Sequence, residues 1–198
     1  KNPLFARAWV NATATWQSWG PLESPLSPAQ AIAVIAYVMD DRLQSTFNDA
    51  VRVAGRSPQE YRDNFHFKTL HFLLTDALAT VRDTQEWTCT KLVHWDCEVR
   101  FEAKRGDTIR FGHFVPIRSS ETSLRCPVKT EFQVHACHGS FSRKLEGLDV
   151  LLIPPFETFQ VTQVTHQGDK TQIKLLSNNS FSKYNCEWLK GDSTGDSL

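Results

Sequence analysis

Cysteine and histidine are the residues of this sequence that could bind a metal or react as thiols, and their spacing does not favour either role. No two cysteines form a C-x-x-C pair, which argues against a zinc site and against a thioredoxin-like centre. His135 and His138 flank Cys137, a cluster that suggests a metal only weakly. His66 and His71 have no second ligand at helical spacing, so each is expected to be a packed or surface histidine. The five cysteines are Cys89, Cys97, Cys126, Cys137 and Cys186.

Two glycosylation sequons start at Asn11 and Asn178, where the sequence reads Asn-Ala-Thr and Asn-Asn-Ser. Together with the dispersed cysteines they favour a secreted or cell-surface protein with disulfides. Because the number of cysteines is odd, one thiol is either free or paired outside this chain. The sequence starts without Met and shows no signal peptide, so we expect a processed or trimmed product.

Size and composition are those of an ordinary globular domain. The chain has 198 residues, of which 40% are hydrophobic and 22% charged, and its formal net charge is zero. That length suits one substantial domain. The neutral balance gives no electrostatic reason to expect nucleic acid or an anionic membrane as a partner. No apolar run approaches the roughly 20 residues of a membrane-spanning helix.

Helical spacing of apolar residues dominates the first half of the chain. Ser27 and Pro28 are typical of an N-cap and first helical residue, Gly55 of a C-terminal cap, and Ser57 of a capping box. We expect a break in the last helical stretch near Asn64. The predicted helices are 4–19, 29–39, 43–54 and 57–81.

After Asp83 the apolar pattern changes to period two, which is typical of strands. An apolar run at 149–153 predicts a strand covered on both faces, and Pro154 and Pro155 predict a kink after it. Helices followed by strands predict an α+β fold and not a parallel doubly wound sheet. The predicted strands are 90–95, 99–103, 108–115, 131–137, 149–153, 156–161 and 172–177.

Five short stretches resemble the vertebrate arginine-specific ecto-mono-ADP-ribosyltransferases of the R-S-E class, in that family's order and over nearly the whole chain. They are FHFKTLHFLLT from Phe65, IRFGHF from Ile109, ACHG from Ala136, LIPPFETFQV from Leu152 and YNC from Tyr184. The resemblance implies the ADP-ribosyltransferase fold, an N-terminal helical lobe followed by two packed, mainly antiparallel sheets around an NAD cleft.

The chemistry of that family explains which groups it needs. Breaking the nicotinamide glycosidic bond passes through a cationic, oxocarbenium-like state that a carboxylate near the ribose stabilises. A second acidic group activates the guanidine acceptor, an arginine grips the pyrophosphate, and a serine positions the nicotinamide side. The resemblance therefore implies an Arg, a Ser-Thr-Ser and a Glu-x-Glu motif.

This sequence departs from the first two motifs. The arginine position falls on His94, or on Trp95 at a neighbouring offset, and neither is a cationic fork at neutral pH. The Ser-Thr-Ser positions fall on Pro116, Ile117 and Arg118.

The acidic motif is missing as well. Its two glutamates fall on Leu148 and Val150, which can neither carry charge nor accept a hydrogen bond. Losing one such group typically costs about 10²–10⁴ in rate. Glu146 or Asp149 could reach the cleft only if Gly147 introduces a bulge. We therefore expect a diverged family member with degenerate catalytic motifs and no catalytic residues at these positions.

The resemblance also assigns the cysteines. It implies a Cys89–Cys137 disulfide and pairs Cys186 with a cysteine upstream of this chain, which could lie on a cleaved fragment. Cys97 and Cys126 lie outside the family pattern but close to the degraded positions, so a bridge between them would remodel the cleft. With Cys137 in a disulfide, no metal site is expected.

The residues that replace the motifs are apolar or bulky, which favours a filled or protein-binding cleft over one for a dinucleotide. We expect a catalytically inactive, secreted or cell-surface protein that binds an extracellular protein and no cofactor. One alternative is an active NAD-dependent arginine-specific transferase with a rewired site, in which Ser119 or Ser120 replaces the family serine. Another is a cell-surface antigen whose precursor carries a GPI anchor.

We expect one domain over 1–190, helical over 1–83 and sheet over 84–190, with a disordered tail at 191–198.

Overall fold

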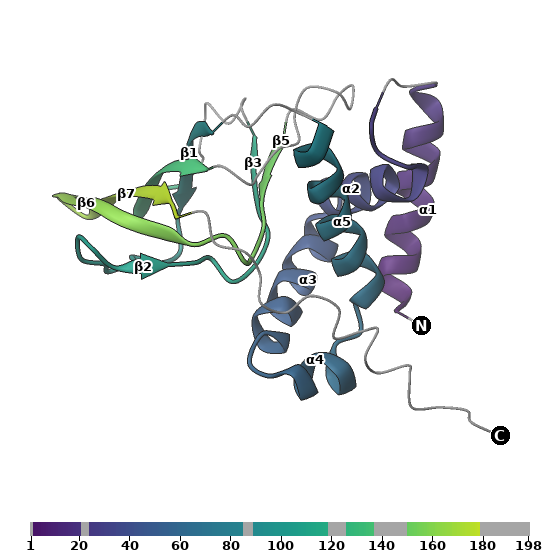
Figure 1. Ribbon diagram of the computed structural model, residues 1–198, viewed down its shortest axis with the longest axis horizontal. Coiled ribbons are helices and arrows are strands. Elements are labelled where there is room, and N and C mark those ends of the chain that lie inside the picture. The colour runs from purple at the N-terminus through teal and green to yellow at the C-terminus, as the bar shows by residue number, and fades with distance from the viewer. Residues whose placement is uncertain (1, 21–23, 85–88, 119–125, 137–149, 179–198) are drawn as a thin grey trace. The chain divides into compact units, whose positions relative to one another are not determined.

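The computed structural model describes residues 2–20, 24–84, 89–118, 126–136 and 150–178 (Figure 1). Its helices come first and its strands afterwards, so the predicted α+β class is confirmed. Backbone contacts divide the chain into two compact units, whose described residues are 2–77 and 78–178. The predicted single domain over 1–190 stays a prediction, and the expected tail lies outside the described residues. The helices are α1 (Pro3–Ser18), α2 (Pro28–Met39), α3 (Asp41–Ala54), α4 (Pro58–Asn64) and α5 (Lys68–Thr84).

The helix boundaries follow from capping residues that the sequence predicts. Ser27 Oγ accepts a hydrogen bond from the N–H of Gln30, whose side chain accepts one from the N–H of Ser27, so α2 begins with a full capping box. Ser57 is the N-cap of α4, where its Oγ accepts a hydrogen bond from the N–H of Glu60 at 3.0 Å. The expected break near Asn64 is confirmed, since α4 ends at that residue.

The helical unit packs around α2, which is buried from Gln30 to Val38. The ring of Phe47 on α3 contacts the ring of Tyr37 edge-on, with centroids 5.7 Å apart. The predicted aromatic stripe of α1 is only half-buried, and Ala8 and Ala12 are the residues of that helix with almost no exposure. None of the described helices combines the length and apolar character that crossing a membrane requires.

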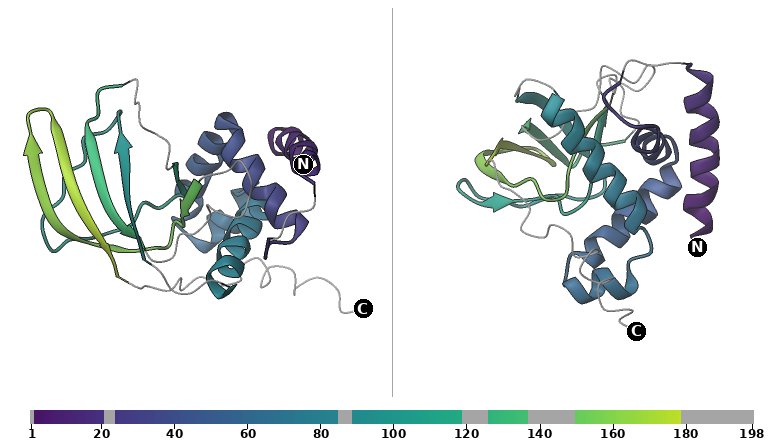
Figure 2. Two further views of the ribbon diagram at one scale, coloured as in Figure 1. Left: turned by 90° about the horizontal axis from the view of Figure 1, so that it is seen from above. Right: turned by 45° about the vertical axis from the view of Figure 1, so that its right-hand side comes forward.

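The strands of the second unit form a curved five-stranded sheet and a two-stranded ladder (Figure 2). The larger sheet has the order β1-β4-β7-β6-β2, and the ladder joins β3 to β5. All pairs are antiparallel except β4 with β7, so the prediction of mainly antiparallel sheets is confirmed. The strands are β1 (Thr90–Asp96), β2 (Thr108–Ile109), β3 (Val115–Arg118), β4 (Thr130–Ala136), β5 (Val150–Ile153), β6 (Phe159–Gln167) and β7 (Lys170–Ser177).

Alternating residues of these strands build the core of the second unit. On β4 the residues alternate between buried and half-buried along the strand, as expected for a sheet with one face on a core. One side of the β3–β5 ladder joins the same core. The core residues are Val115, Ile117, Phe132, Val134, Ala136, Leu151, Ile153, Phe159, Val161, Ile173 and Leu175.

The expected strand at 99–103 is absent, because side-chain oxygens take its hydrogen bonds. The N–H of Phe101 donates to Thr130 Oγ1 at 2.9 Å, and that hydroxyl donates to the carbonyl of Val99 at 2.9 Å. The N–H of Val99 donates to Asp96 Oδ1 at 2.7 Å. Such local side-chain bonds compete with a sheet ladder, so the alternating pattern alone led to a wrong prediction.

The single strand expected at 108–115 is also wrong. The segment forms two strands, with β2 ending at Ile109 and β3 beginning at Val115. Gly112 lies between them with φ of 72°, a left-handed conformation that glycine adopts readily. The segment predicted as one strand therefore contributes β2 to the five-stranded sheet and β3 to the two-stranded ladder.

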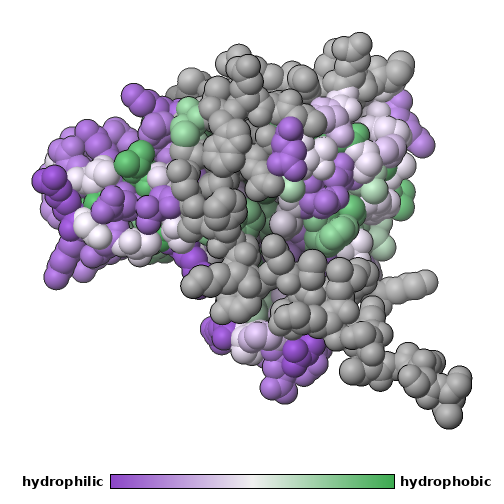
Figure 3. Space-filling view, in the orientation of Figure 1, coloured by the Kyte–Doolittle hydropathy of each residue, from purple (hydrophilic) through white to green (hydrophobic). Residues whose placement is uncertain are grey.

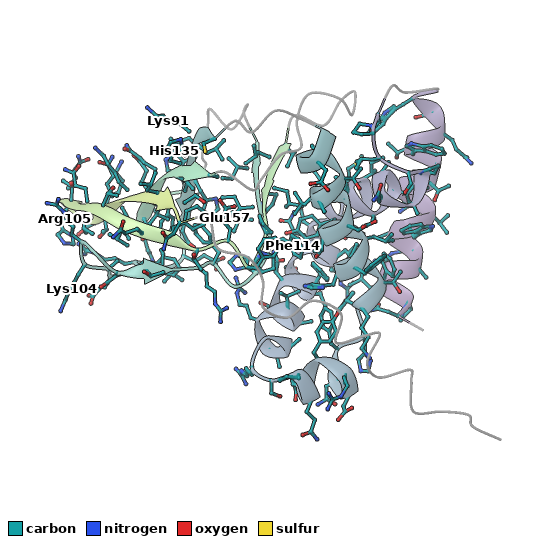
Figure 4. The ribbon with its side chains drawn as sticks, viewed as in Figure 1. Lys91, Lys104, Arg105, Phe114, His135 and Glu157 are labelled. Atoms are coloured by element: carbon teal, nitrogen blue, oxygen red, sulfur yellow. A yellow bond between two sulfur atoms is a disulfide. The ribbon has the colours of Figure 1, made fainter. Side chains whose placement is uncertain are left out.

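The half-buried strand expected from Phe156 begins later, at Phe159. A turn precedes it, in which the N–H of Glu157 donates to the carbonyl of Pro154 at 3.3 Å. The side chain of Glu157 is fully buried in this turn segment (Figure 4). The buried run itself is confirmed as β5, whose residues from Val150 to Ile153 are all buried.

Candidate functional site

The position that the resemblance aligns with the family arginine is an imidazole inside an aromatic cluster. β1 pairs His94 with Phe132 of β4, so both residues face the core side of the sheet. The two rings are stacked, with centroids 6.1 Å apart and planes 19° apart. Phe111 meets the His94 ring edge-on at 6.1 Å and also contacts the ring of His113. The imidazole of His94 thus has the ring of Phe132 stacked against it and the ring of Phe111 edge-on to it.

Burial lowers the pKa of His94 to about 4, below its ordinary value of 6.5. The charge of Asp96 acts in the opposite direction, and His113 adds a smaller lowering effect on the same pKa. The imidazole is therefore neutral at pH 7, and it cannot provide the positive charge with which an arginine holds a pyrophosphate.

The neighbouring offset, Trp95, points to the opposite face of the sheet. Its indole Nε1 donates to Glu131 Oε2 at 3.4 Å. Lys170 Nζ and Gln172 Nε2 donate to the same carboxylate at 2.7 Å each, and Gln133 Nε2 donates at 3.1 Å. Burial raises the pKa of Glu131, but these hydrogen bonds outweigh burial and hold the pKa at about 2. Trp95 is thus one donor in a polar network around Glu131, and neither offset supplies a guanidinium.

The positions aligned with the family serines and the second glutamate face one another across the β3–β5 ladder. Arg118 lies opposite Val150, and Pro116 lies opposite Leu152. Residues paired in an antiparallel ladder share a face, so Pro116, Leu152 and Val150 lie on one face, whereas Ile117 faces the core. Val150 is 4% exposed and Leu152 is fully buried. The ladder therefore brings the position that the resemblance aligns with the first serine to the same face as the position aligned with the second glutamate, and Pro116 and Val150 occupy them.

Several residues that the sequence singles out lie outside the described residues. They include Leu148, which is the first position of the acidic motif, and Glu146 and Asp149, the two acidic residues that could replace it. The two serines that could replace the family serine lie there too. These residues are Leu148, Glu146, Asp149, Ser119 and Ser120.

A disulfide joins Cys97 and Cys126, with Cα atoms 6.0 Å apart, so the bridge that the sequence raised as a possibility is present. It links the segment after β1 to the segment before β4. Cys89 is also disulfide-bonded, but its predicted partner Cys137 and the third predicted site, Cys186, lie outside the described residues.

The two sequon asparagines are both exposed. Asn11 lies in the middle of α1, and Asn178 directly follows β7. The N–H of Asn178 donates to the carbonyl of Thr158 at 2.9 Å. Their glycosylation stays a prediction.

His71 is a packed histidine, as the sequence predicts. Its ring contacts those of Phe47, Tyr61 and Phe65 at 5.7–6.5 Å, and burial lowers its pKa to about 4. His66 is exposed. Within the described ranges no three His, Cys, Asp or Glu side chains are placed to hold a metal ion.

Sequence reasoning missed the aromatic enclosure of His94 and the polar network of Glu131. Phe132 comes opposite His94 only through the register of β1 with β4, and Phe111 reaches the same ring from the segment between β2 and β3. The alternation of Phe132 with Glu131 was a usable signal, because it places the two residues on opposite faces of β4.

Comparison with known proteins defines the class. The family model described as NAD:arginine ADP-ribosyltransferase matches residues 1–183. The chain belongs to this family, as the resemblance predicts.

Among its relatives is the erythroblast NAD(P)(+)--arginine ADP-ribosyltransferase of Gallus gallus, 41% identical over 201 residues and 96% of this chain. The GPI-linked NAD(P)(+)--arginine ADP-ribosyltransferase 1 of Mus musculus is 34% identical over 96% of this chain. Ecto-ADP-ribosyltransferase 4 of Homo sapiens is 32% identical over the same share. The chain spans only 62–65% of the length of these relatives.

Solved structures agree with the fold. The mono-ADP-ribosyltransferase ART2.2 superposes with a TM-score of 0.70 at 26% identity, covering 91% of this chain and 81% of that one. Exoenzyme S of Pseudomonas aeruginosa has a TM-score of 0.65 over 97% of this chain and 98% of its own, at 14% identity. The latter likeness concerns the fold alone.

Proposed function

We propose that this protein is a catalytically inactive member of the ADP-ribosyltransferase family that acts by binding another protein outside the cell. The family scaffold would serve as a binding surface, and neither NAD nor another cofactor would be needed.

The observation that carries this proposal is the environment of His94. A pyrophosphate carries negative charge that must be matched when it leaves water. At the position aligned with the family arginine, the chain instead has an imidazole that is neutral at pH 7 and stacked on Phe132. An uncharged, ring-lined position favours an apolar contact over a dianionic ligand.

The β3–β5 ladder supports the same proposal. The carboxylate that stabilises an oxocarbenium-like state is replaced by Val150, and Pro116 replaces the first serine. An alkyl group contributes no charge to such a state. Regaining transfer would therefore require a different acidic group to reach this face.

The location is inferred from the relatives. Their names include the words GPI-linked for the mouse relative and Ecto for the human one. Two exposed sequon asparagines and disulfide-bonded cysteines support a secreted or cell-surface location. The proposal includes a GPI anchor on the precursor. It also includes an N-terminal fragment that is linked to this chain through Cys186.

The test is calorimetric titration of the disulfide-intact protein with NAD, with thermal unfolding as a second measurement. A ligand that binds the folded state alone raises the apparent stability by mass action. We expect neither heat nor a thermal shift at millimolar NAD. The mouse relative, assayed in parallel, is the positive control. Saturable NAD binding by this chain would overturn the proposal that the cleft takes no cofactor.

The second candidate function is an active arginine-specific transferase with a rewired site. The names of the chicken relatives at 37–41% identity favour it, because each includes arginine ADP-ribosyltransferase. The test is transfer of labelled ADP-ribose from NAD to an arginine-rich acceptor. Activity that Glu146→Gln or Asp149→Asn abolished, but Glu98→Gln did not, would establish this alternative. Absence of transfer, together with activity of the mouse relative, would exclude it.

A further inference from the structure

A turn that carries two basic residues is clamped onto β6. The N–H of Gly106 donates to the carbonyl of Val161 at 2.8 Å, and the N–H of Val161 donates to the carbonyl of Asp107 at 2.8 Å. The carboxylate of Asp107 accepts the N–H of Lys104 at 2.8 Å. Gly106 has φ of 94°, where a side chain would be strained. The backbone that presents Lys104 and Arg105 is therefore held in one conformation.

Strand β6 bulges beside this turn. Its pairing with β7 shifts between Val161 and Gln163, so Thr162 is an additional residue on the β6 side. The hydroxyl of Thr162 donates to the carbonyl of Lys174 at 3.3 Å. Turn and bulge together form an open depression of about 640 Å³. Its lining residues are Lys104, Arg105, Thr162, Gln163 and Val164.

The depression has an excess of positive charge. Lys104 and Arg105 are both exposed, and neither forms an ion pair within the ranges that the structure describes. The nearest acidic residues in sequence are Asp107, whose carboxylate already accepts the turn N–H, and the exposed Glu102. Figure 4 shows both basic side chains at the same end of the sheet, beside β2 and β6, and Figure 3 shows that this end is mainly hydrophilic.

The lining indicates the class of ligand. A guanidinium and an ammonium together suit a tetrahedral oxyanion, which the guanidinium can bind through two parallel hydrogen bonds. The hydroxyl of Thr162 and the amide of Gln163 suit the polar edge of a sugar ring, and Val164, which also packs against the core, lies beside them. We infer that this depression binds a sugar that carries a sulfate or phosphate ester.

The depression is separate from the position of His94. The sheet order places β1, which carries His94, at one edge and β2 at the other, with three strands between them. The inference therefore goes beyond the proposed function and does not depend on whether NAD binds.

The test is a nuclear magnetic resonance titration of the ¹⁵N-labelled protein with glucose 6-sulfate, glucose 6-phosphate, glucose and sodium sulfate. We expect at least one ester to shift the amide signals of Gly106, Thr162 and Gln163 with a dissociation constant of about 1 mM, which is typical of a small exposed site. The ester that binds more tightly identifies the preferred oxyanion. Glucose should leave these signals unchanged, and bare sulfate should bind at least about threefold more weakly than the better ester.

The double variant Lys104→Gln/Arg105→Gln should bind the ester at least about tenfold more weakly. The matched control Arg7→Gln/Lys91→Gln removes one arginine and one lysine from exposed positions elsewhere and should bind as the parent does. Thermal unfolding of each variant verifies that it is folded. Absence of shifts at Gly106 and Thr162 with both esters, equal affinity for bare sulfate, or equal losses in both double variants would overturn the inference.

Discussion

The imidazole of His94 stacks on the ring of Phe132, with centroids 6.1 Å apart and planes 19° apart. The residue that the resemblance aligns with a family arginine is thus part of the packing of the sheet. The stacked imidazole is neutral at pH 7. Protonation of this one side chain should therefore destabilise the packing of β1 against β4.

The first prediction concerns acid stability. The pKa of His94 is about 4 in the folded protein and near its ordinary 6.5 when unfolded, so the unfolded state binds more protons between these values. The free energy of unfolding therefore falls as the pH falls from about 6.5 to 4, by roughly 1–3 kcal/mol from this residue. The variant His94→Phe keeps an aromatic ring and should lose this part of the pH dependence. Urea unfolding of parent and variant at pH 7 and pH 4.5 measures the difference.

His71 provides an independent comparison, because burial lowers its pKa to about 4 as well and its ring partners differ from those of His94. The variant His71→Phe should remove a contribution of similar size, and the two effects should add. Identical pH dependence in the parent and both variants would contradict the burial of these imidazoles.

The second prediction tests whether one acidic residue is enough to restore the family chemistry. Val150→Glu would place a carboxylate at a position that is 4% exposed. We expect the free energy of unfolding to fall by about 2–4 kcal/mol at pH 7. We expect no transfer of ADP-ribose, because in the proposed alignment His94 and Pro116 still stand at the positions of the other groups. Val150→Gln, which is equally large but uncharged, should be less destabilised. Transfer activity in Val150→Glu would show that a single substitution separates this chain from an enzyme.

The third prediction concerns the disulfide between Cys97 and Cys126, which closes a segment with a sequence separation of 29. Its removal should lower the free energy of unfolding by about 3–4 kcal/mol, because the unfolded chain gains conformational freedom. The single variants Cys97→Ser and Cys126→Ser should each be destabilised as much as the double variant, since each breaks the same bond. Additive losses in urea unfolding would mean that the cysteines contribute separately.

The fourth prediction concerns Glu131, whose side chain is 13% exposed and whose carboxylate accepts hydrogen bonds from Lys170, Gln172 and Gln133. Its pKa of about 2 lies below the ordinary 4.5, so its contribution is present above pH 4.5 and is lost as the pH falls toward 2. Glu131→Gln should lower the free energy of unfolding by about 1–3 kcal/mol at pH 7. The difference from the parent should shrink below pH 4.

The variant Lys170→Met serves as the control for that network, since it removes one partner and keeps the carboxylate. It should raise the pKa of Glu131 as followed by ¹³C resonance of the carboxyl group. An unchanged pKa in Lys170→Met would contradict the geometry of the ion pair.

The sequence by itself determined the family and the order of helices before strands. Capping residues such as Ser27 and Ser57 act within a few residues of their own position, so their helix starts could be predicted from local chemistry. The apolar run before Pro154 likewise identified a buried strand. The sequence also led to the prediction that the catalytic motifs are degenerate at positions such as His94 and Val150, which stays a prediction.

Only the tertiary structure decided what surrounds those residues. The stacking of His94 on Phe132 depends on the register of β1 with β4, and the pairing of Arg118 with Val150 depends on a ladder between strands far apart in sequence. The irregular path of Phe101 is set by Thr130, a residue 29 positions away. Such contacts are non-local, so neither the period of apolar residues nor local capping chemistry contains them, and they appear only when the folded sheet fixes which side chains meet.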